Sequence, residues 1–235
     1  MATSPVAVVP AHNEEQTIGS IVRELRREGF EVCVVDDGSS DLTARRAAEG
    51  GAVLLSLPAN IGVGGALRCG FRWAVSRGAD VVVQVDGDGQ HPPDQARRLL
   101  NEAESLGCDL LVGSRFHPSS PGYRVGPVKR AAIRVLSRRV RRVSGVQVTD
   151  PTSGFRVIRG SLIDLFAQSY PSDYLADTVE ALMIAGMAGY SVAEAPVPMR
   201  ERIEGKAHAG SVRSAVLMTE LLLVSMLRGR RLSAR

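Results

Sequence analysis

The 235-residue chain has few cysteines, few aromatic residues and no long apolar run. Its three cysteines, Cys33, Cys69 and Cys108, lie far apart without metal-ligand spacing, so they predict small core residues and exclude a disulfide framework. The first residues lack the basic stretch and long apolar run of a secretory signal. These features favour a folded protein of the reducing cytoplasm.

The longest apolar stretch, residues 214–227, contains Glu220 and is shorter than the roughly 20 residues that span a bilayer. It therefore predicts either a helix docked at a membrane surface or a packed terminal helix. We expect one domain over residues 1–210, followed by this apolar helix and a basic tail at 211–235. The localisation expected is cytoplasmic, free or peripheral on the inner face of the membrane, and the oligomeric state stays open.

Positive charge is concentrated in residues 129–142, which hold seven basic residues and no acidic one. A basic amphipathic helix attracts anionic lipid, phosphorylated ligands or nucleic acid, although such a pattern is also typical of a solvated helix face. Aromatic residues make up only 4% of the chain and none lies in this segment. A base-stacking platform is therefore absent, and we expect no nucleic-acid partner.

Short apolar runs alternate with helical patterns in the first half of the chain. Strands are predicted at 5–10, 31–37, 52–57 and 80–88, and helices near 14–28, 41–49 and 62–76. This alternation predicts an α/β fold with a mostly parallel sheet and helices on both faces. Ligands of such sheets bind beyond the carboxyl ends of the strands.

The pattern is less regular after residue 108. We expect a strand at 108–116, a loop at 116–127, the basic helix at 128–143, helices near 161–168 and 176–188, a short strand pair near 190–199 and a loop at 201–210.

The segment VVVQVDGDGQHPPD, residues 81–94, leads an apolar strand directly into Asp86 and Asp88. Two carboxylates so close repel each other unless a cation lies near them. Their oxygens, with the side-chain carbonyl of Gln90, suit Mg²⁺ or Mn²⁺, and nucleotide phosphates commonly complete the coordination of such an ion. The alternative is a polar turn that caps the next helix.

Two further segments place polar or glycine residues at strand ends. Asp36 and Asp37 end the second strand, where carboxylates can accept hydrogen bonds from a base or ribose, or can cap the following helix. Residues 60–70 supply Asn60 and several glycines, Gly65 among them, but they do not open the first βαβ unit as a dinucleotide fingerprint requires.

Six segments in order, VVPAHNEEQTIGSIV, VVDDGSSDLT, NIGVGGALRCGFRWA, VDGDGQHPPD, VGSRF and DPTSGFR, resemble the inverting family 2 glycosyltransferases of GT-A (Rossmann-like) fold. They are most similar to the branch with dolichol-phosphate mannose synthases and bacterial polyprenyl-phosphate glycosyltransferases. The resemblance covers about residues 5–200. It implies a hexosyltransferase that uses a nucleoside diphosphate sugar, with uridine or guanosine as its nucleoside, and a Mg²⁺ or Mn²⁺ ion.

The resemblance assigns roles to individual positions. The donor nucleotide pocket is expected from Pro10, Ala11, Glu14, Asp36, Asp37, Asn60, Gly65 and Asp86, and the metal ligands are expected to be Asp86, Asp88 and Gln90. Asp88, Arg115 and Asp150 are the expected catalytic residues. Arg115 would face the donor and acceptor phosphates, and Asp150 lies in the segment that lines the acceptor side.

An anionic lipid-phosphate acceptor needs cations rather than a general base, and the candidates are Arg115, Lys129, Arg130, Arg202 and Lys206. If the acceptor is a hydroxyl, Asp150 is the candidate base, and Asp177 or Glu180 could assist. The first hypothesis is transfer to a polyprenyl or dolichyl phosphate at a membrane surface. The alternatives are the same donor chemistry on a soluble acceptor, such as a phosphorylated metabolite or natural product, or an inactive nucleotide-sugar binding protein.

Overall fold

The computed structural model describes residues 5–120, 126–172 and 177–198. The strands are β1 (Val6–Ala11), β2 (Glu31–Asp36), β3 (Val53–Ser56), β4 (Val81–Gln84), β5 (Leu110–Ser114), β6 (Arg156–Arg159) and β7 (Val192–Pro196). The helices are α1 (Ile18–Arg27), α2 (Thr43–Glu49), α3 (Val63–Ser76), α4 (Asp94–Leu106), α5 (Pro127–Ser144), α6 (Ser161–Ser169) and α7 (Asp177–Met187).

The strands form one seven-stranded sheet in the order β3-β2-β1-β4-β6-β5-β7. All neighbouring pairs are parallel except those of β6, which runs antiparallel to both β4 and β5. Arg156 at the start of β6 lies opposite Gln84 at the end of β4. The predicted mostly parallel α/β sheet is confirmed.

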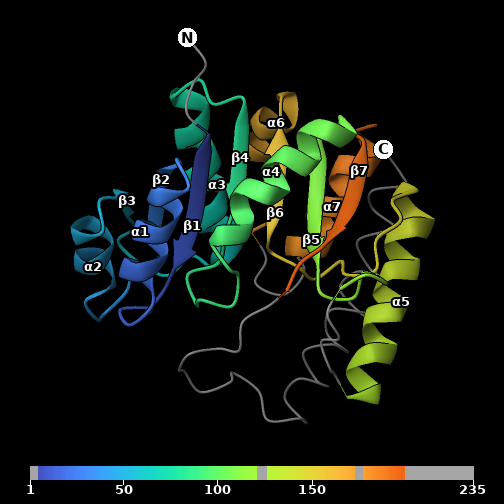
Figure 1. Cartoon of the computed structure of the whole chain (residues 1–235), viewed down its shortest axis with the longest axis horizontal. Helices are drawn as coiled ribbons and strands as arrows, with labels where there is room; N and C mark the ends of the chain where they lie inside the picture. Colours follow the sequence, from blue (N-terminus) through green and yellow to red (C-terminus); the bar gives the residue numbers. More distant parts are fainter. Residues whose placement is uncertain (1–4, 121–125, 173–176, 199–235) are drawn as a thin grey trace.

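Helices cover both faces of the sheet (Figure 1). One core cluster joins α1 and α4 to the sheet through residues such as Ile18, Leu25 and Leu99. A second cluster joins α3, α6 and α7 to the other face, with Phe71 and Phe166 in ring contact at 5.5 Å between centroids. These valine-rich strands have apolar partners on both sides, as expected of buried parallel strands.

Several predicted elements differ from the observed ones; the strand expected at 80–88, for example, ends at Gln84. Helix α1 begins at Ile18 rather than at residue 14, because residues 14–17 form a turn in which the Thr17 N–H donates to the Glu14 carbonyl at 3.1 Å. The strand pair expected near 190–199 is, among the described residues, the single strand β7, which pairs with β5 instead of with a hairpin partner. The apolar stretch expected as a terminal helix, 211–235, and the loop at 201–210 lie outside the described residues.

The cysteines follow the sequence prediction. Cys33 and Cys108 are buried, Cys69 is half-buried, and all three are free thiols. Burial raises the pKa of Cys33 to about 12, so this thiol stays protonated and unreactive. Across the described ranges, no helix combines the length and the apolar character needed to cross a membrane.

Candidate active site

The carboxyl ends of β1, β2 and β4 surround a cavity of about 230 Å³. It is lined by Pro10, Ala11, His12, Glu14, Asp37, Asn60, Gly62, Val63, Ala66, Asp86, Gly87 and Asp88. The structure therefore brings together most of the residues predicted for the nucleotide pocket. Asp36 and Gly65 are not among the lining residues, and His12, Gly62, Val63 and Ala66 join without having been singled out.

Asp37 helps to shape this cavity because its carboxylate binds the backbone of the loop at residues 60–62. Its two carboxylate oxygens accept hydrogen bonds from the backbone N–H groups of Ile61 and Gly62, at 2.8 and 2.9 Å. Asp36 instead accepts from the Ser39 N–H at 3.2 Å, within the turn that follows β2. Asp37 thus fixes the 60–62 loop at the mouth of α3, and Asp36 stabilises its own turn.

The loop that carries Asp86 and Asp88 is fixed against β1 and α1. A Cβ on Gly87 would lie 3.0 Å from the Pro10 carbonyl oxygen, so glycine allows the close approach of the two strand ends. The buried Thr17 hydroxyl donates to the Gly87 carbonyl at 2.6 Å. The Asp88 carboxylate accepts from the Gln90 N–H at 3.0 Å. The loop is therefore held in place by protein contacts.

Asp86 lies between this loop and the segment before β6. A Cβ on Gly154 would lie 2.8 Å from Asp86 Oδ2, a contact that real side chains essentially never make. Burial raises the pKa of Asp86 to about 6, while the positive charges of Arg115 and Arg156 act in the opposite direction. A carboxylate in this setting gains from a nearby cation.

These residues fit a divalent cation. Asp86 and Asp88 are half-buried, alternate with buried glycines and line the same cavity. Within the described ranges, no cluster of three or more His, Cys, Asp or Glu side chains could hold a metal ion. An ion bound by this pair would therefore need further oxygen ligands from Gln90, water or phosphate, which is the usual arrangement for Mg²⁺ and Mn²⁺ beside nucleotides.

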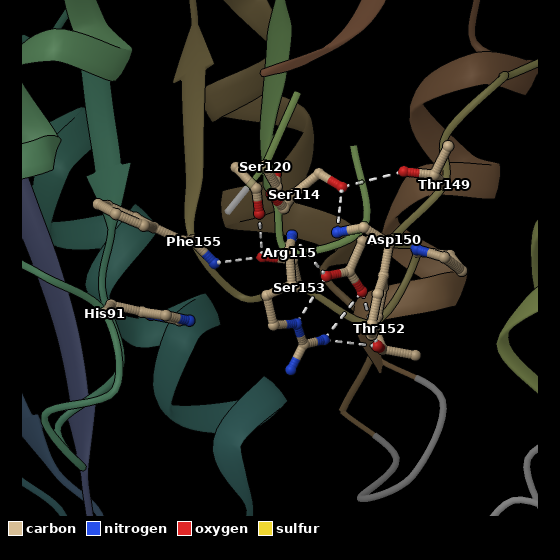
Figure 2. Close-up of polar contacts among 12 residues, drawn as sticks. His91, Ser114, Arg115, Ser120, Thr149, Asp150, Thr152, Ser153 and Phe155 are labelled. Carbon is tan, nitrogen blue, oxygen red and sulfur yellow. Dashed lines mark hydrogen bonds and ion pairs between the residues drawn. The ribbon is translucent and has the colours of Figure 1, made fainter. Parts of the chain in front are cut away.

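His91, to which sequence reasoning gave no role, supports the Asp86 loop. Its Nδ1 accepts the backbone N–H of Asp86 at 3.0 Å, and its Nε2 lies 3.6 Å from Asp86 Oδ2. Its ring stacks on Phe155, with 5.0 Å between centroids and 15° between planes (Figure 2). Burial lowers the pKa of His91 to about 4, so the ring is neutral, with Nδ1 as acceptor and the proton on Nε2.

Figure 2 also shows a buried ion pair between Arg115 and Asp150. Arg115 donates from Nε and Nη2 to the two oxygens of Asp150, at 2.6 and 2.8 Å, and from Nη2 to Thr152 Oγ1 at 2.8 Å. The Asp150 side chain is fully buried, and the hydrogen bonds and charge of Arg115 hold its pKa below its usual range despite that burial. Both catalytic candidates are therefore engaged with each other.

Glu194 of β7 binds the backbone of the segment that carries Asp150. Its carboxylate accepts hydrogen bonds from the backbone N–H groups of Thr149 and Asp150, each at 2.9 Å. Glu194 was not among the sequence candidates, because nothing local marks a residue of an edge strand as the partner of a segment 45 residues earlier.

A second cavity of about 440 Å³ lies between the loop after β5 and helix α5. Its lining includes Arg115, Ser120, Arg130, Arg134, Ile133 and Thr149. The Lys129 side chain is exposed, but the protein atoms packed around it and the charge of Arg115 still lower its pKa. Arg134 adds a cation that was not singled out, whereas Arg202 and Lys206 lie outside the described residues.

The N-terminus of α7 brings two more acidic side chains into the interior. Asp177 and Glu180 are both buried. Burial raises the pKa of Asp177 to about 6, against the lowering effects of hydrogen bonds from Thr178 and the charge of Arg156. Arg156 is fully buried and donates to the Thr178 carbonyl at 2.7 Å, so it links β6 to this helix.

The family model described as "Glycosyl transferase family 2" matches residues 6–166, which run from β1 into α6 and include all the residues that line the smaller cavity. The chain belongs to glycosyltransferase family 2. It is therefore a glycosyltransferase with a GT-A fold, as the sequence motifs predicted.

The chain is similar to named relatives over most of its length. It is 34% identical to the undecaprenyl-phosphate mannosyltransferase of Micrococcus luteus, with 90% of each protein covered. It is 30% identical to the polyprenol monophosphomannose synthase of Mycolicibacterium smegmatis, over 90% of this chain and 83% of that protein.

Among solved structures, the glucosyl-3-phosphoglycerate synthase of Mycobacterium tuberculosis, in complex with Mn²⁺, uridine diphosphate and phosphoglyceric acid, matches with a TM-score of 0.73. This match covers 96% of the present chain and 78% of that one at 22% identity, and it shows the shared fold.

Proposed function

We propose that this glycosyltransferase moves a hexose from a nucleoside diphosphate sugar to a polyprenyl phosphate, with inversion at the anomeric carbon. The similarity to the undecaprenyl-phosphate mannosyltransferase of Micrococcus and the polyprenol monophosphomannose synthase of Mycolicibacterium supports the acceptor class. The solved relative with Mn²⁺ and uridine diphosphate supports the donor class. The two aspartates of the smaller cavity suit a donor's metal ion, and the arginines of the larger cavity suit an acceptor phosphate.

The smaller cavity is the donor end. Its wall of Pro10, Ala11 and Asn60 would hold the nucleoside, and its floor carries Asp86 and Asp88. A divalent ion held by this pair, with Gln90, would stabilise the negative charge that develops on the leaving diphosphate. His91 and Gly154 keep the Asp86 carboxylate in position, since one binds its backbone and the other leaves room for its oxygens.

The larger cavity is the acceptor end. The acceptor phosphate brings its own nucleophilic oxygen, so no general base is required, and Arg115, Arg130 and Arg134 supply charge that would hold it. That oxygen forms the new bond to the anomeric carbon while the bond from this carbon to the diphosphate oxygen breaks. The electron pair leaves with the nucleoside diphosphate. Asp150 orients Arg115 through the paired hydrogen bonds.

A single observation carries this proposal, and it concerns the position of Arg115. It lines the larger cavity, and it is near enough to Asp86 for its charge to lower the pKa of that carboxyl. A cation in this position can contact an acceptor phosphate on one side and the donor diphosphate on the other, and so bring two anions together for reaction.

A second candidate is the same transfer to a soluble phosphorylated acceptor. It is favoured by the likeness to a structure that contains phosphoglyceric acid and by the same basic cavity. A hydroxyl nucleophile requires a base. The pKa of Asp150 is lowered and both its oxygens contact Arg115, so this carboxylate is poorly suited to accept the proton, and the buried Asp177 lines neither cavity.

The experiment is a release assay for nucleoside diphosphate with the purified full chain. UDP- and GDP-sugars are offered with Mn²⁺ or Mg²⁺, and with a short polyprenyl phosphate, phosphoglyceric acid or no acceptor, beside Asp88→Asn as the control. Metal-dependent turnover stimulated by the lipid phosphate supports the first candidate. Stimulation only by the soluble acid supports the second, and donor binding without turnover under any condition would indicate an inactive binding protein.

A further inference from the structure

Helix α5 presents an exposed face that is basic over its whole length. Its sequence, PVKRAAIRVLSRRVRRVS, has no acidic residue. The exposed cations are Lys129, Arg130, Arg134, Arg138, Arg141 and Arg142. Arg130 and Arg134 also line the larger cavity, whereas Arg138, Arg141 and Arg142 do not. Most of this charge therefore lies beyond the needs of a single bound phosphate.

The same exposed face carries an apolar strip. Val128 is 69% exposed and Val135 is 40% exposed, and the exposed Ala131 lies between them at helical spacing. The opposite face is already used for packing, since Ile133 and Leu136 are buried. An apolar strip flanked by arginines on a solvent-facing helix is the pattern of helices that lie in a membrane interface.

The position of α5 agrees with such a contact. In Figure 1 it stands at the outer edge of the molecule, and its N-terminal turns project beyond the carboxyl ends of the strands. The larger cavity lies between this helix and the loop after β5. A flat surface that touches the exposed face of α5 would therefore lie beside the cavity.

We propose that the exposed face of α5 docks on an anionic lipid bilayer and thereby holds the larger cavity at the level of the lipid headgroups. The cations contribute attraction to anionic lipid, and Val128, Ala131 and Val135 contribute shallow burial among the acyl chains. Nucleic acid fits less well, because α5 has no aromatic residue to stack on bases and exposes apolar side chains. Access to a lipid acceptor is a consequence that rests on the proposed function, but the docking itself does not.

The test is co-sedimentation of the full chain with phosphatidylcholine vesicles, with and without phosphatidylglycerol. We expect binding only to the anionic vesicles and its loss at high salt. The double variant Arg138→Gln/Arg142→Gln should lower the partition coefficient about 25-fold, at roughly fivefold per cation. The matched control, Arg23→Gln/Arg27→Gln, removes the same charge from the exposed side of α1 and should bind as the unmodified chain does.

A further variant, Val135→Asp, tests the apolar strip and should weaken binding to the anionic vesicles at low salt. Equal losses in the α5 and α1 double variants would overturn the proposal, as would equal binding to both kinds of vesicle. So would tighter binding to duplex DNA that the α5 double variant abolishes.

Turnover with a short water-soluble polyprenyl phosphate, measured without vesicles, separates this inference from the proposed function. We expect Arg138→Gln/Arg142→Gln to keep that turnover. If the unmodified chain binds anionic vesicles through α5 and yet transfers no sugar to lipid phosphate, the docking stands and the acceptor assignment fails.

Discussion

The Arg115–Asp150 pair gives the most discriminating prediction, because two roles for Asp150 lead to different double-mutant cycles. If Asp150 orients Arg115, then Asp150→Asn and Arg115→Gln damage the same function. If Asp150 is a general base, the two substitutions damage different functions. The hydrogen bonds of the pair, at 2.6 and 2.8 Å, and the further bond to Thr152 favour the first role.

The expected size of the effect follows from these contacts. A hydrogen bond to a charged group is worth about 1.5–3 kcal/mol, so each single variant should reduce kcat/KM for the lipid phosphate about 10- to 150-fold. Within the cycle, the double variant should be no worse than Arg115→Gln alone, which gives a coupling of about 2 kcal/mol. Asp150→Asn should also destabilise the fold, near the lower end of the roughly 3–5 kcal/mol for a broken buried pair, because the Arg115 side chain keeps 13% exposure.

The assay combines steady-state kinetics for both substrates with urea unfolding of all four proteins. Thr152→Ala is the matched control, since it removes one neutral partner of Arg115 and should cost only a few-fold in kcat/KM. Additive losses, in which the double variant is worse by the product of the single effects, would refute the positioning role and restore Asp150 as a base. The positioning role would also be refuted if the fall of kcat at acidic pH, seen in the unmodified chain, were absent in Asp150→Asn.

Three other substitutions test the neighbouring groups. Gly154→Ala should weaken Mn²⁺ binding in a calorimetric titration more than tenfold, because the new methyl would lie 2.8 Å from Asp86 Oδ2; unchanged affinity would show that this carboxylate is not a ligand. His91→Phe should raise KM for the metal, and His91→Asn should raise it less, because only Asn can accept the hydrogen bond from the Asp86 N–H. Equal increases in the two variants would show that the ring stack on Phe155 is the important contact. Burial raises the pKa of Asp177 to about 6, so the folded chain keeps a proton that the unfolded chain loses from about pH 3.8 upward, and stability falls as pH rises between these values. In urea unfolding at pH 7, the free energy of unfolding of Asp177→Asn should therefore exceed that of the parent by up to about 3 kcal/mol. This difference should disappear below about pH 4, and an equal difference at both pH values would contradict the assignment.

The sequence was most informative where function and local pattern coincide. Valine-rich runs that end in Asp37 or in Asp86 and Asp88 predicted parallel strands with polar ends, and the structure places these three residues around one cavity. Alternation and polarity are local features, so they can be found without knowledge of the fold. They do not reveal whether a carboxylate faces a ligand or the backbone, which is why Asp36 was grouped with the pocket although it binds the N–H of Ser39.

Long-range pairing accounts for what the sequence could not supply. The run VTDPTSGFRVI has the same apolar character whether its strand is parallel or antiparallel, and only the sheet shows that β6 is reversed. The same is true of the hydrogen bond from the Thr149 N–H to Glu194 and of the ring stack between His91 and Phe155. Both contacts join residues that no spacing rule in the sequence relates. Such contacts depend on the order of the strands in the sheet.

The reversal of β6 explains how one segment can serve both halves of the site. In a parallel sheet the ligand edge receives the residues that follow each strand, but an antiparallel strand brings the residues that precede it to that same edge. Because Arg156 pairs with Gln84, the segment 150–155 lies beside the loop that carries Asp86. Within this segment Gly154 leaves space for Asp86, Phe155 stacks on His91 and Asp150 binds Arg115. A parallel β6 would carry the same residues to the opposite edge, so the link between the smaller and the larger cavity follows from the direction of one strand.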